Sequence, residues 1–397
     1  MSKPSAPEMD SPVQAGLSPA RLMRLEAAMQ RQIEAGHVPG VTMAISRRGK
    51  LAYAKSLGAL RPGGPRMRPD AIFRIYSMTK PIVSAALMML VEEGRVFISE
   101  PVSKFLPEFA NVKVGVESAG KLKLAPLERP ITLQDLLRHT SGLTYGFTGD
   151  SLVQQRYAKA TLGGPDLDSA GVAAALARLP LIAQPGARWD YGHSTDVLGR
   201  VIELITGQTL GAHLREKIFG PLGMVDTGFF APAASHDRLA EPFENDPDSG
   251  EAVNLINTRL APRFESAGGG LVSTITDYLR FMHLFYNGGA LDGVRLLGRR
   301  TVAHMTSDHL GPELIVNRNL LLLPGHGFGL GFAVRLAAGM APSAGTIGEY
   351  FWGGIAGTSF WIAPQEELAA IILIQVAPSQ RDYYRQLFRN LVYAALM

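Results

Sequence analysis

The sequence predicts an α/β (α+β) fold in which one antiparallel sheet, flanked by helices, is built from both ends of the chain. Strand-like runs concentrate near the two ends of the 397-residue chain, and residues 144–185 carry helical patches without a convincing strand. The length allows roughly two or three domain-sized units. We therefore expect an α/β domain formed by residues 1–100 and 266–397, with a mainly helical insert domain formed by residues 101–265.

Composition excludes several classes of protein. The net charge of +4 comes from 39 basic and 35 acidic residues without a long basic run, so nucleic acid is not an expected partner. The absence of cysteine excludes disulfides and thiolate metal sites. No segment has the length and apolarity of a membrane span, and residues 1–10 lack the apolar region of a signal peptide. We expect a cytoplasmic protein without a membrane partner, and the sequence leaves open whether it is a monomer or a homodimer.

The first elements are a helix and a hairpin. Residues 1–17 contain Pro and Ser and are expected to be loose. Ser18 and Pro19 are typical of an N-cap and a first helical position, and apolar residues share one face of the helix that follows. Residues 41–45 and 51–57 then have the pattern of two strands joined by a turn.

The most informative stretch is Ser77-Met78-Thr79-Lys80. Residues 84–91 are apolar nearly all round, which predicts a buried helix. Since Pro81 is tolerated only in a first turn, that helix should begin near Ser77. Ser77 and Lys80 then share one face, and a lysine in a buried first turn loses hydration, which favours the neutral form that a general base needs. A serine in this position can become a nucleophile without a histidine.

The Ser-x-x-Lys spacing alone is not specific, because it occurs again at Ser118 and Lys121. No buried helix follows that second copy, and we expect it to lie in a surface loop. The alternative for Ser77 is a helix cap beside an exposed lysine. Further motifs are therefore needed to assign a site.

The remaining elements alternate between helices and late strands. We expect further helices at residues 131–138, 170–179, 196–205, 275–285 and 381–396. Strand patterns fall at residues 327–334, 350–354, 358–362 and 369–376. The last three strands are separated by short turn clusters, which is typical of an antiparallel meander.

Two stretches qualify as partners of a serine–lysine pair. Tyr191 follows a Pro-Gly turn and precedes a helix, so it could stand on a loop as a proton relay, or it could be an ordinary packed aromatic residue. Gly353 and Gly354 follow Trp352 within a strand pattern. Paired glycines there indicate close approach of a ligand or another backbone, or alternatively a β-bulge.

Together these stretches resemble the three motifs of the serine β-lactamase/penicillin-binding-protein family. They are most similar to those of the family VIII carboxylesterases, which resemble class C β-lactamases. The resemblance extends over nearly the whole chain, and it includes further recurrent stretches. The motifs are Ser77-Met78-Thr79-Lys80, Tyr191-Gly192-His193 and Trp352-Gly353-Gly354, and the further stretches are residues 139–143, 221–224 and 268–271.

The resemblance implies a β-lactamase-like fold and a role for each matching residue. Ser77 would be the nucleophile, with Lys80 and Tyr191 as the base system that takes its proton and returns it to the leaving alkoxide. The backbone N–H groups of Ser77 and Ile355 would form the oxyanion hole. Trp352, Gly353 and Gly354 would contact substrate. Members of this group need no metal or organic cofactor, and we find no metal-binding spacing.

The sequence departs from class C β-lactamases at two positions. His193 stands where their second motif ends in Asn, and it could be a third proton carrier or, as we prefer, a substrate-site residue that positions Tyr191 or Lys80. Trp352 replaces a lysine that helps to hold the carboxylate of the drug. Because Trp352 supplies no cation, we expect neutral esters with short acyl chains to be preferred. Cationic residues from the helical insert could still allow weak cephalosporin hydrolysis.

These observations predict a serine carboxylesterase that hydrolyses a small-molecule ester through an acyl-enzyme on Ser77. Three alternatives stay open: a β-lactamase or D-Ala-D-Ala peptidase, an acyltransferase of the same fold, and a non-catalytic penicillin-recognising module. One fold hosts several reactions, so the fold cannot decide among them.

Overall fold

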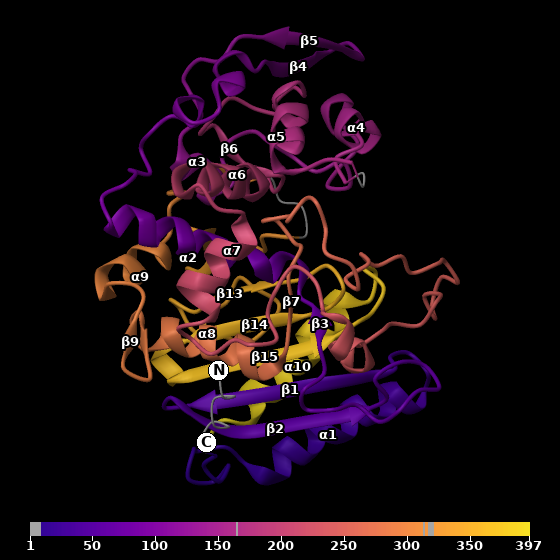
Figure 1. Ribbon diagram of the computed structural model, residues 1–397. Coiled ribbons are helices and arrows are strands. Elements are labelled where there is room, and N and C mark those ends of the chain that lie inside the picture. The colour runs from indigo at the N-terminus through magenta and orange to yellow at the C-terminus, as the bar shows by residue number, and fades with distance from the viewer. Residues whose placement is uncertain (1–8, 164–165, 313, 317–320) are drawn as a thin grey trace.

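A computed structural model describes residues 9–163, 166–312, 314–316 and 321–397 (Figure 1). Its centre is a seven-stranded sheet in the order β11-β12-β13-β14-β15-β1-β2, and every neighbouring pair is antiparallel. The strands are β1 (Gly40–Arg47), β2 (Lys50–Gly58), β11 (His326–Phe328), β12 (Ala333–Arg335), β13 (Tyr350–Gly353), β14 (Ser359–Ala363) and β15 (Leu368–Ile374). The predicted α/β fold, with a sheet built from both ends of the chain, is confirmed.

Helices cover both faces of the sheet. In β15, Ile371 and Leu373 belong to the core shared with α8 (Ile275–Tyr286), whereas Ile372 and Ile374 belong to the core shared with α1 (Pro19–Glu34) and α10 (Arg381–Ala395). This alternation follows from the two-residue period of a strand, and coverage of both faces explains why β1 and β15 are buried along their whole length.

The two ends of the described chain lie close together. Leu17 forms an antiparallel bridge with Leu396, and Ala15 and Leu17 are fully buried against α1 and α10. The expectation that residues 1–17 are loose is therefore wrong for residues 9–17, because Ala15 and Leu17 belong to the core under the two terminal helices and the Asp10 N–H bonds to the Leu51 carbonyl. Residues 1–8 lie outside the described part.

Residues 101–265 form mostly helices and turns, and residues 114–206 of this stretch lie in the upper part of Figure 1. The elements are η2 (Val102–Lys104), η3 (Pro107–Asn111), β4 (Val114–Ser118), β5 (Lys121–Ala125), α3 (Leu133–Leu137), α4 (Leu152–Lys159), α5 (Ser169–Ala177), β6 (Arg188–Trp189), α6 (Ser194–Thr206), α7 (Leu210–Leu214), η4 (Arg215–Phe219) and η5 (Ala233–Arg238). The division of the chain into domains at residues 100 and 265 stays a prediction.

The second Ser-x-x-Lys copy lies in a hairpin rather than in the expected surface loop. Ser118 ends β4 and Lys121 begins β5, and the two residues between them, Ala119 and Gly120, both have positive φ. That backbone is typical of a tight hairpin turn. The hairpin tip is exposed, so Ser118 has no buried helix beside it.

The single strand expected at residues 327–334 is also wrong. The chain reverses there between β11 and β12, with Gly331 at φ 97° and the Gly329 N–H bonded to the Phe332 carbonyl at 2.7 Å. Glycine tolerates this backbone because it has no Cβ. The smaller elements are β3 (Phe73–Arg74), which pairs with β7 (Val272–Ser273), the hairpin of β8 (Ala290–Leu291) and β9 (Val294–Arg295), α9 (Arg299–Met305), β10 (Ile315–Val316), which pairs with β6, and η6 (Pro364–Glu366).

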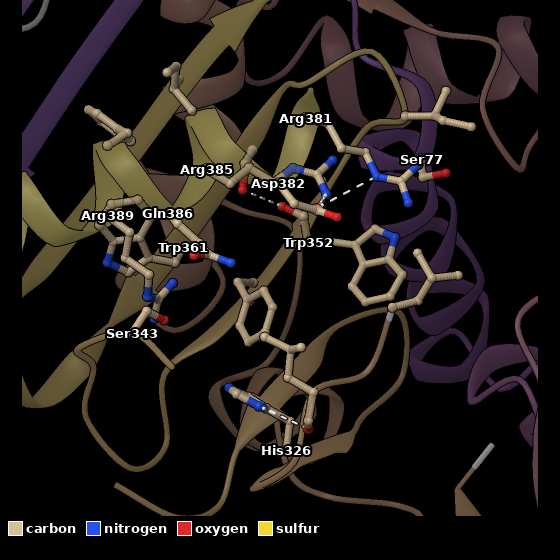
Figure 2. Close-up of a pocket in the computed structure, with 18 of the residues that line it drawn as sticks. Ser77, His326, Ser343, Trp352, Trp361, Arg381, Asp382, Arg385, Gln386 and Arg389 are labelled. Carbon is tan, nitrogen blue, oxygen red and sulfur yellow. Dashed lines mark hydrogen bonds and ion pairs between the residues drawn. The ribbon is translucent and has the colours of Figure 1, made fainter. Parts of the chain in front are cut away.

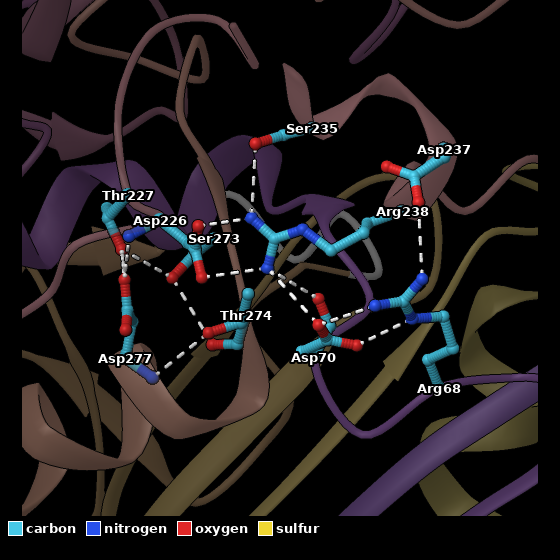
Figure 3. A network of polar contacts seen from close by, with 10 residues as sticks. All are labelled: Arg68, Asp70, Asp226, Thr227, Ser235, Asp237, Arg238, Ser273, Thr274 and Asp277. Atoms are coloured by element: carbon cyan, nitrogen blue, oxygen red, sulfur yellow. Dashed lines mark hydrogen bonds and ion pairs between the residues drawn. The ribbon is translucent and has the colours of Figure 1, made fainter. Parts of the chain in front are cut away.

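A polar network anchors the segment that leads into the site (Figure 3). Arg68 forms a bidentate ion pair with Asp70, and Arg238 bonds to the Asp70 carbonyl at 3.1 Å and to the Asp226 carboxylate. Asp277, in the first turn of α8, accepts the Asp226 N–H at 2.8 Å. The network thereby ties the chain just before β3 to the start of α8.

Candidate active site

Ser77 lies in a single 3₁₀ turn, η1 (Tyr76–Met78), which leads directly into the buried helix α2 (Thr79–Glu92). The predicted helix start near Ser77 is thus two residues early for the α-helix itself. The preceding Tyr76 has φ 44°, a strained conformation for a bulky residue. Such outliers cluster at functional sites, and this one projects Ser77 from the join between β3 and α2.

Lys80 is fully buried, and its Nζ lies 3.3 Å from Ser77 Oγ. It also donates to the Tyr145 hydroxyl at 3.2 Å and to the Gly268 carbonyl at 2.6 Å. A neutral lysine, the form that a base requires, has two donors for Tyr145 and Gly268 and one lone pair for the Ser77 hydroxyl. The structure therefore brings Ser77 and Lys80 together, as their spacing predicts, and fixes the lysine from two distant segments.

Tyr145 is a site residue that sequence reasoning missed. Its hydroxyl contacts Lys80, and its ring packs edge-on against Tyr191 and His193, with centroids 5.4 and 4.4 Å away. Burial, together with the nearby Asp196 carboxylate, holds the pKa of Tyr145 well above its ordinary value. Tyr145 thus stays protonated and serves Lys80 as a neutral hydrogen-bond partner. Its only sequence signal is its place two residues after the recurrent stretch 139–143.

Tyr191 is buried between Lys80 and Trp352. The Lys80 nitrogen lies 4.6 Å from the centroid of the Tyr191 ring, and the hydroxyl accepts a hydrogen bond from Trp352 Nε1 at 3.1 Å. The structure therefore brings the second and third motifs into direct contact. Trp352 orients the Tyr191 hydroxyl in addition to forming an apolar wall.

His193 packs against the ring of Tyr145, with which Lys80 is also in contact. Its Nδ1 is 2.9 Å from the Asp196 carboxylate, which also accepts the Gly268 N–H at 2.8 Å. Burial alone would raise the pKa of Asp196, but the hydrogen bond from His193 and the positive charges of His193 and Lys80 outweigh it and lower the pKa. Because Gly268 also binds Lys80 through its carbonyl, this contact chain supports a positioning role for His193 rather than a third proton carrier.

The predicted oxyanion-hole residues Ser77 and Ile355 line one cavity. Within the described residues, the Ile355 N–H has no hydrogen-bond acceptor. Gly354 packs so closely that a Cβ there would lie 2.4 Å from Thr358 Oγ1 and 2.5 Å from the Ile75 carbonyl. Close backbone approach, which paired glycines indicate, is thus present at Gly354, where the strand end meets Ile75, two residues before Ser77.

The cavity has a volume of about 300 Å³ and mixed walls (Figure 2). Apolar side chains and the first turns of α10 enclose the side nearest Ser77. Among the lining residues are Phe147, Tyr191, Leu321, Leu323, Trp352, Gly353, Arg381, Asp382 and Arg385. Cations therefore do reach the cavity, although Trp352 supplies none. Arginines reach the cavity from α10, which lies outside the helical insert and far from Trp352 in the sequence.

Two classes of feature are absent from the described residues. No cluster of three or more His, Asp or Glu side chains there could hold a metal ion. In the same part of the chain, no helix has the length and apolar character needed to cross a membrane.

The antiparallel sheet and the juxtaposed serine, lysine and tyrosine define the class of protein: the serine β-lactamase/penicillin-binding-protein superfamily. A family model described as Beta-lactamase matches residues 25–394, and the chain belongs to that family. The chain is 35% identical over 365 residues to Protein Rv1367c of Mycobacterium tuberculosis, covering 89% of this chain and 90% of that protein.

The relatives with named activities include both esterases and acyltransferases. The chain is 31% identical over 383 residues to Esterase EstB of Burkholderia gladioli, covering 89% of this chain and 90% of that protein. Among solved structures, it resembles EstCE1, "a hydrolase with promiscuous acyltransferase activity", with TM-score 0.79, 26% identity and coverage of 94% and 98%. The predicted resemblance to the family VIII esterases is confirmed, and these neighbours support hydrolysis or acyl transfer in general.

Proposed function

We propose that this protein is a serine carboxylesterase that hydrolyses short-chain carboxylic esters through an acyl-enzyme on Ser77. The observation that carries the proposal is the 3.3 Å contact between Lys80 Nζ and Ser77 Oγ at the wall of a cavity. A nucleophile within reach of a base is the arrangement that covalent catalysis requires. The esterase relatives support the same reaction class.

In the proposed mechanism, Lys80 and Tyr191 act as one unit. As Ser77 Oγ attacks the ester carbonyl, its proton passes to this pair, and the N–H groups of Ser77 and Ile355 stabilise the negative carbonyl oxygen. The C–O bond to the alcohol then breaks, and the proton is returned to the alkoxide. Water attacks the acyl-enzyme by the same steps, releasing the carboxylic acid and free Ser77. No metal or organic cofactor is needed.

The preference for short acyl chains follows from the size and lining of the cavity. Its volume of about 300 Å³ lies at the lower end of typical ligand pockets. Trp352 and Phe147 offer apolar surface for a small acyl or alkyl group. A long chain would have to leave the cavity and lose that contact.

The two Ser-x-x-Lys copies provide a matched test. Ser77→Ala should abolish turnover of p-nitrophenyl butyrate, because the nucleophile is lost. Ser118→Ala, at an exposed hairpin tip, should retain the wild-type kcat/KM. Loss of activity in Ser118→Ala with activity retained in Ser77→Ala would refute the assignment. Nitrocefin should be hydrolysed much more slowly than the ester, and the opposite preference would favour a β-lactamase.

Acyl transfer to an alcohol is a second candidate, favoured by the activity stated for EstCE1. The same acyl-enzyme would pass its acyl group to an alcohol in place of water. Adding a primary alcohol during p-nitrophenyl butyrate turnover, and quantifying ester product against butyrate, measures the partition. A product mixture containing only butyrate would leave hydrolysis as the sole reaction.

A further inference from the structure

Arg381 brings to the cavity that contains Ser77 a guanidinium that is ion-paired with Asp382 but forms no hydrogen bond within the described residues. Its side chain is 18% exposed, and Nε is buried without a hydrogen-bond partner within the described residues. The nearest carboxylate oxygen, on Asp382, is 3.6 Å away, which is beyond hydrogen-bond distance. In Figure 2 the guanidinium is directed toward the side of the cavity on which Ser77 lies. A buried donor in this state is costly unless a ligand accepts its hydrogen bonds.

The other two arginines of α10 that line the cavity already have partners. Arg385 donates to the carbonyls of Gly354 and Thr358 and to Asp382, and thereby holds the strand end that precedes Ile355. Burial lowers the pKa of Arg385 to about 10, which still leaves it charged at neutral pH. Arg389 donates to the Glu349 carboxylate and to the Ala344 carbonyl at 2.9 Å. Nε of Arg385 is also buried without a partner, but both other guanidinium nitrogens of Arg385 are bonded, whereas the guanidinium of Arg381 forms no hydrogen bond within the described residues. Arg381 is therefore the arginine of this group with the most hydrogen-bonding capacity left for a ligand.

The surroundings of Arg381 also favour an anion. Arg381 is the first residue of a 15-residue helix, so the positive end of the helix dipole lies at the same wall of the cavity. Asp382 offsets part of this charge, but its side chain is 49% exposed. A planar guanidinium binds carboxylates by two parallel hydrogen bonds, and the nearby apolar wall of Trp352 and Phe147 strengthens such a contact by excluding water.

We propose that Arg381 forms a carboxylate-binding subsite, and that the preferred substrates are short esters carrying a carboxylate in addition to the ester bond. This inference rests on the proposed esterase function and specifies its substrate class. It reverses the expectation of neutral substrates, because the cation that Trp352 does not provide comes from α10.

The test compares matched ester pairs that differ in one carboxylate. On the acyl side, the pair is p-nitrophenyl butyrate and mono-p-nitrophenyl succinate. On the alcohol side, it is phenyl acetate and 3-acetoxybenzoate. For at least one pair, Arg381→Gln should lower the ratio of kcat/KM for the charged ester to that for the neutral ester by roughly tenfold or more, the scale of one charge-assisted hydrogen bond. Arg381→Lys should restore part of that ratio.

The control is Arg300→Gln, which removes an exposed positive charge on α9 and should leave both ratios unchanged. A second readout is independent of turnover: monomethyl succinate should bind the Ser77→Ala protein, and binding should weaken by a similar factor in Ser77→Ala/Arg381→Gln. Unchanged ratios for both pairs, or unchanged binding, would overturn the subsite. If wild type hydrolyses no ester but Arg381 still controls binding, the esterase proposal fails and the subsite stands.

Discussion

Replacing Tyr191 by Phe should affect both rate and stability, because its hydroxyl has two roles in the structure. As half of the proposed Lys80–Tyr191 base unit, it should contribute about a hundredfold or more to kcat/KM, the usual scale of a positioned acid or base. The substitution also leaves Trp352 Nε1 without its acceptor at 3.1 Å, and the indole is 5% exposed. An orphaned buried donor costs about 1–3 kcal/mol of unfolding free energy.

Tyr145→Phe is the informative comparison. It removes a different hydroxyl from Lys80, at 3.2 Å, but leaves the lysine bonded to Ser77 and Gly268. We expect a smaller rate loss, on the order of tenfold, since one hydrogen bond to a charged group is lost. Tyr383→Phe, at an exposed position on α10, should change neither property.

The assay is kcat/KM for p-nitrophenyl butyrate together with urea unfolding of each variant. The rate losses should rank Tyr191→Phe above Tyr145→Phe. A Tyr191→Phe protein with unchanged kcat/KM, or a Tyr145→Phe protein that is the more damaged of the two, would remove Tyr191 from the relay. An unfolding free energy unaffected by Tyr191→Phe would contradict the role given to the Trp352 hydrogen bond.

Two buried carboxylates provide pH-dependent predictions of opposite sign. Burial would raise the pKa of Asp135, but hydrogen bonds from Arg129 and Thr140 outweigh it and lower the pKa to about 2. The ionised carboxylate therefore contributes about 2 kcal/mol to the free energy of unfolding above pH ~4, and this contribution is lost as pH falls toward ~2. Asp135→Asn should thus be less stable than wild type at pH 7 and equally stable near pH 2. Burial raises the pKa of Asp277 to about 6, so its cost appears as pH rises from ~4 to ~6. Between pH 4 and pH 7, the free energy of unfolding of Asp277→Asn should therefore rise by about 3 kcal/mol relative to that of wild type. Urea unfolding at each pH measures both, and pH-independent differences would refute the assigned pKa shifts.

The elements that sequence patterns identified are those whose signals are local. A serine and proline mark the start of α1, and apolar runs separated by turn residues mark β13, β14 and β15. The hairpin at Ser118 was not predicted, because both its strands are largely exposed and its Ala-Gly turn lacks the usual Asn-Gly signal. The chain reversal at Gly331 was not predicted, because it lies within an apolar run that is typical of a single strand.

In the candidate site, too, sequence patterns identified the residues with local signals and missed those that only folding brings together. Ser77 and Lys80 meet because residues three positions apart on a helical turn share a face, which their spacing alone predicts. Local patterns made Tyr191 and the stretch at Trp352 candidates, but only motif resemblance placed them in one site with Ser77, since they lie 161 residues apart and meet by folding. Tyr145 and Arg381 belong to no recognised motif. Only the folded chain shows that Tyr145 contacts Lys80 and that Arg381 lines the cavity.

The third motif therefore has to be interpreted together with α10. Where the related lactamases have a lysine, Trp352 donates its N–H to Tyr191, a contact that fixes the proposed relay and contributes no charge. Positive charge enters the same cavity from Arg381 and Arg385, of which Arg385 supports Gly354 beside the proposed oxyanion hole. Orientation of the tyrosine and recognition of charge thus lie on separate elements in this chain. Substitutions at Trp352 should act mainly on the Tyr191 relay, whereas substitutions at Arg381 should act on the choice between charged and neutral esters.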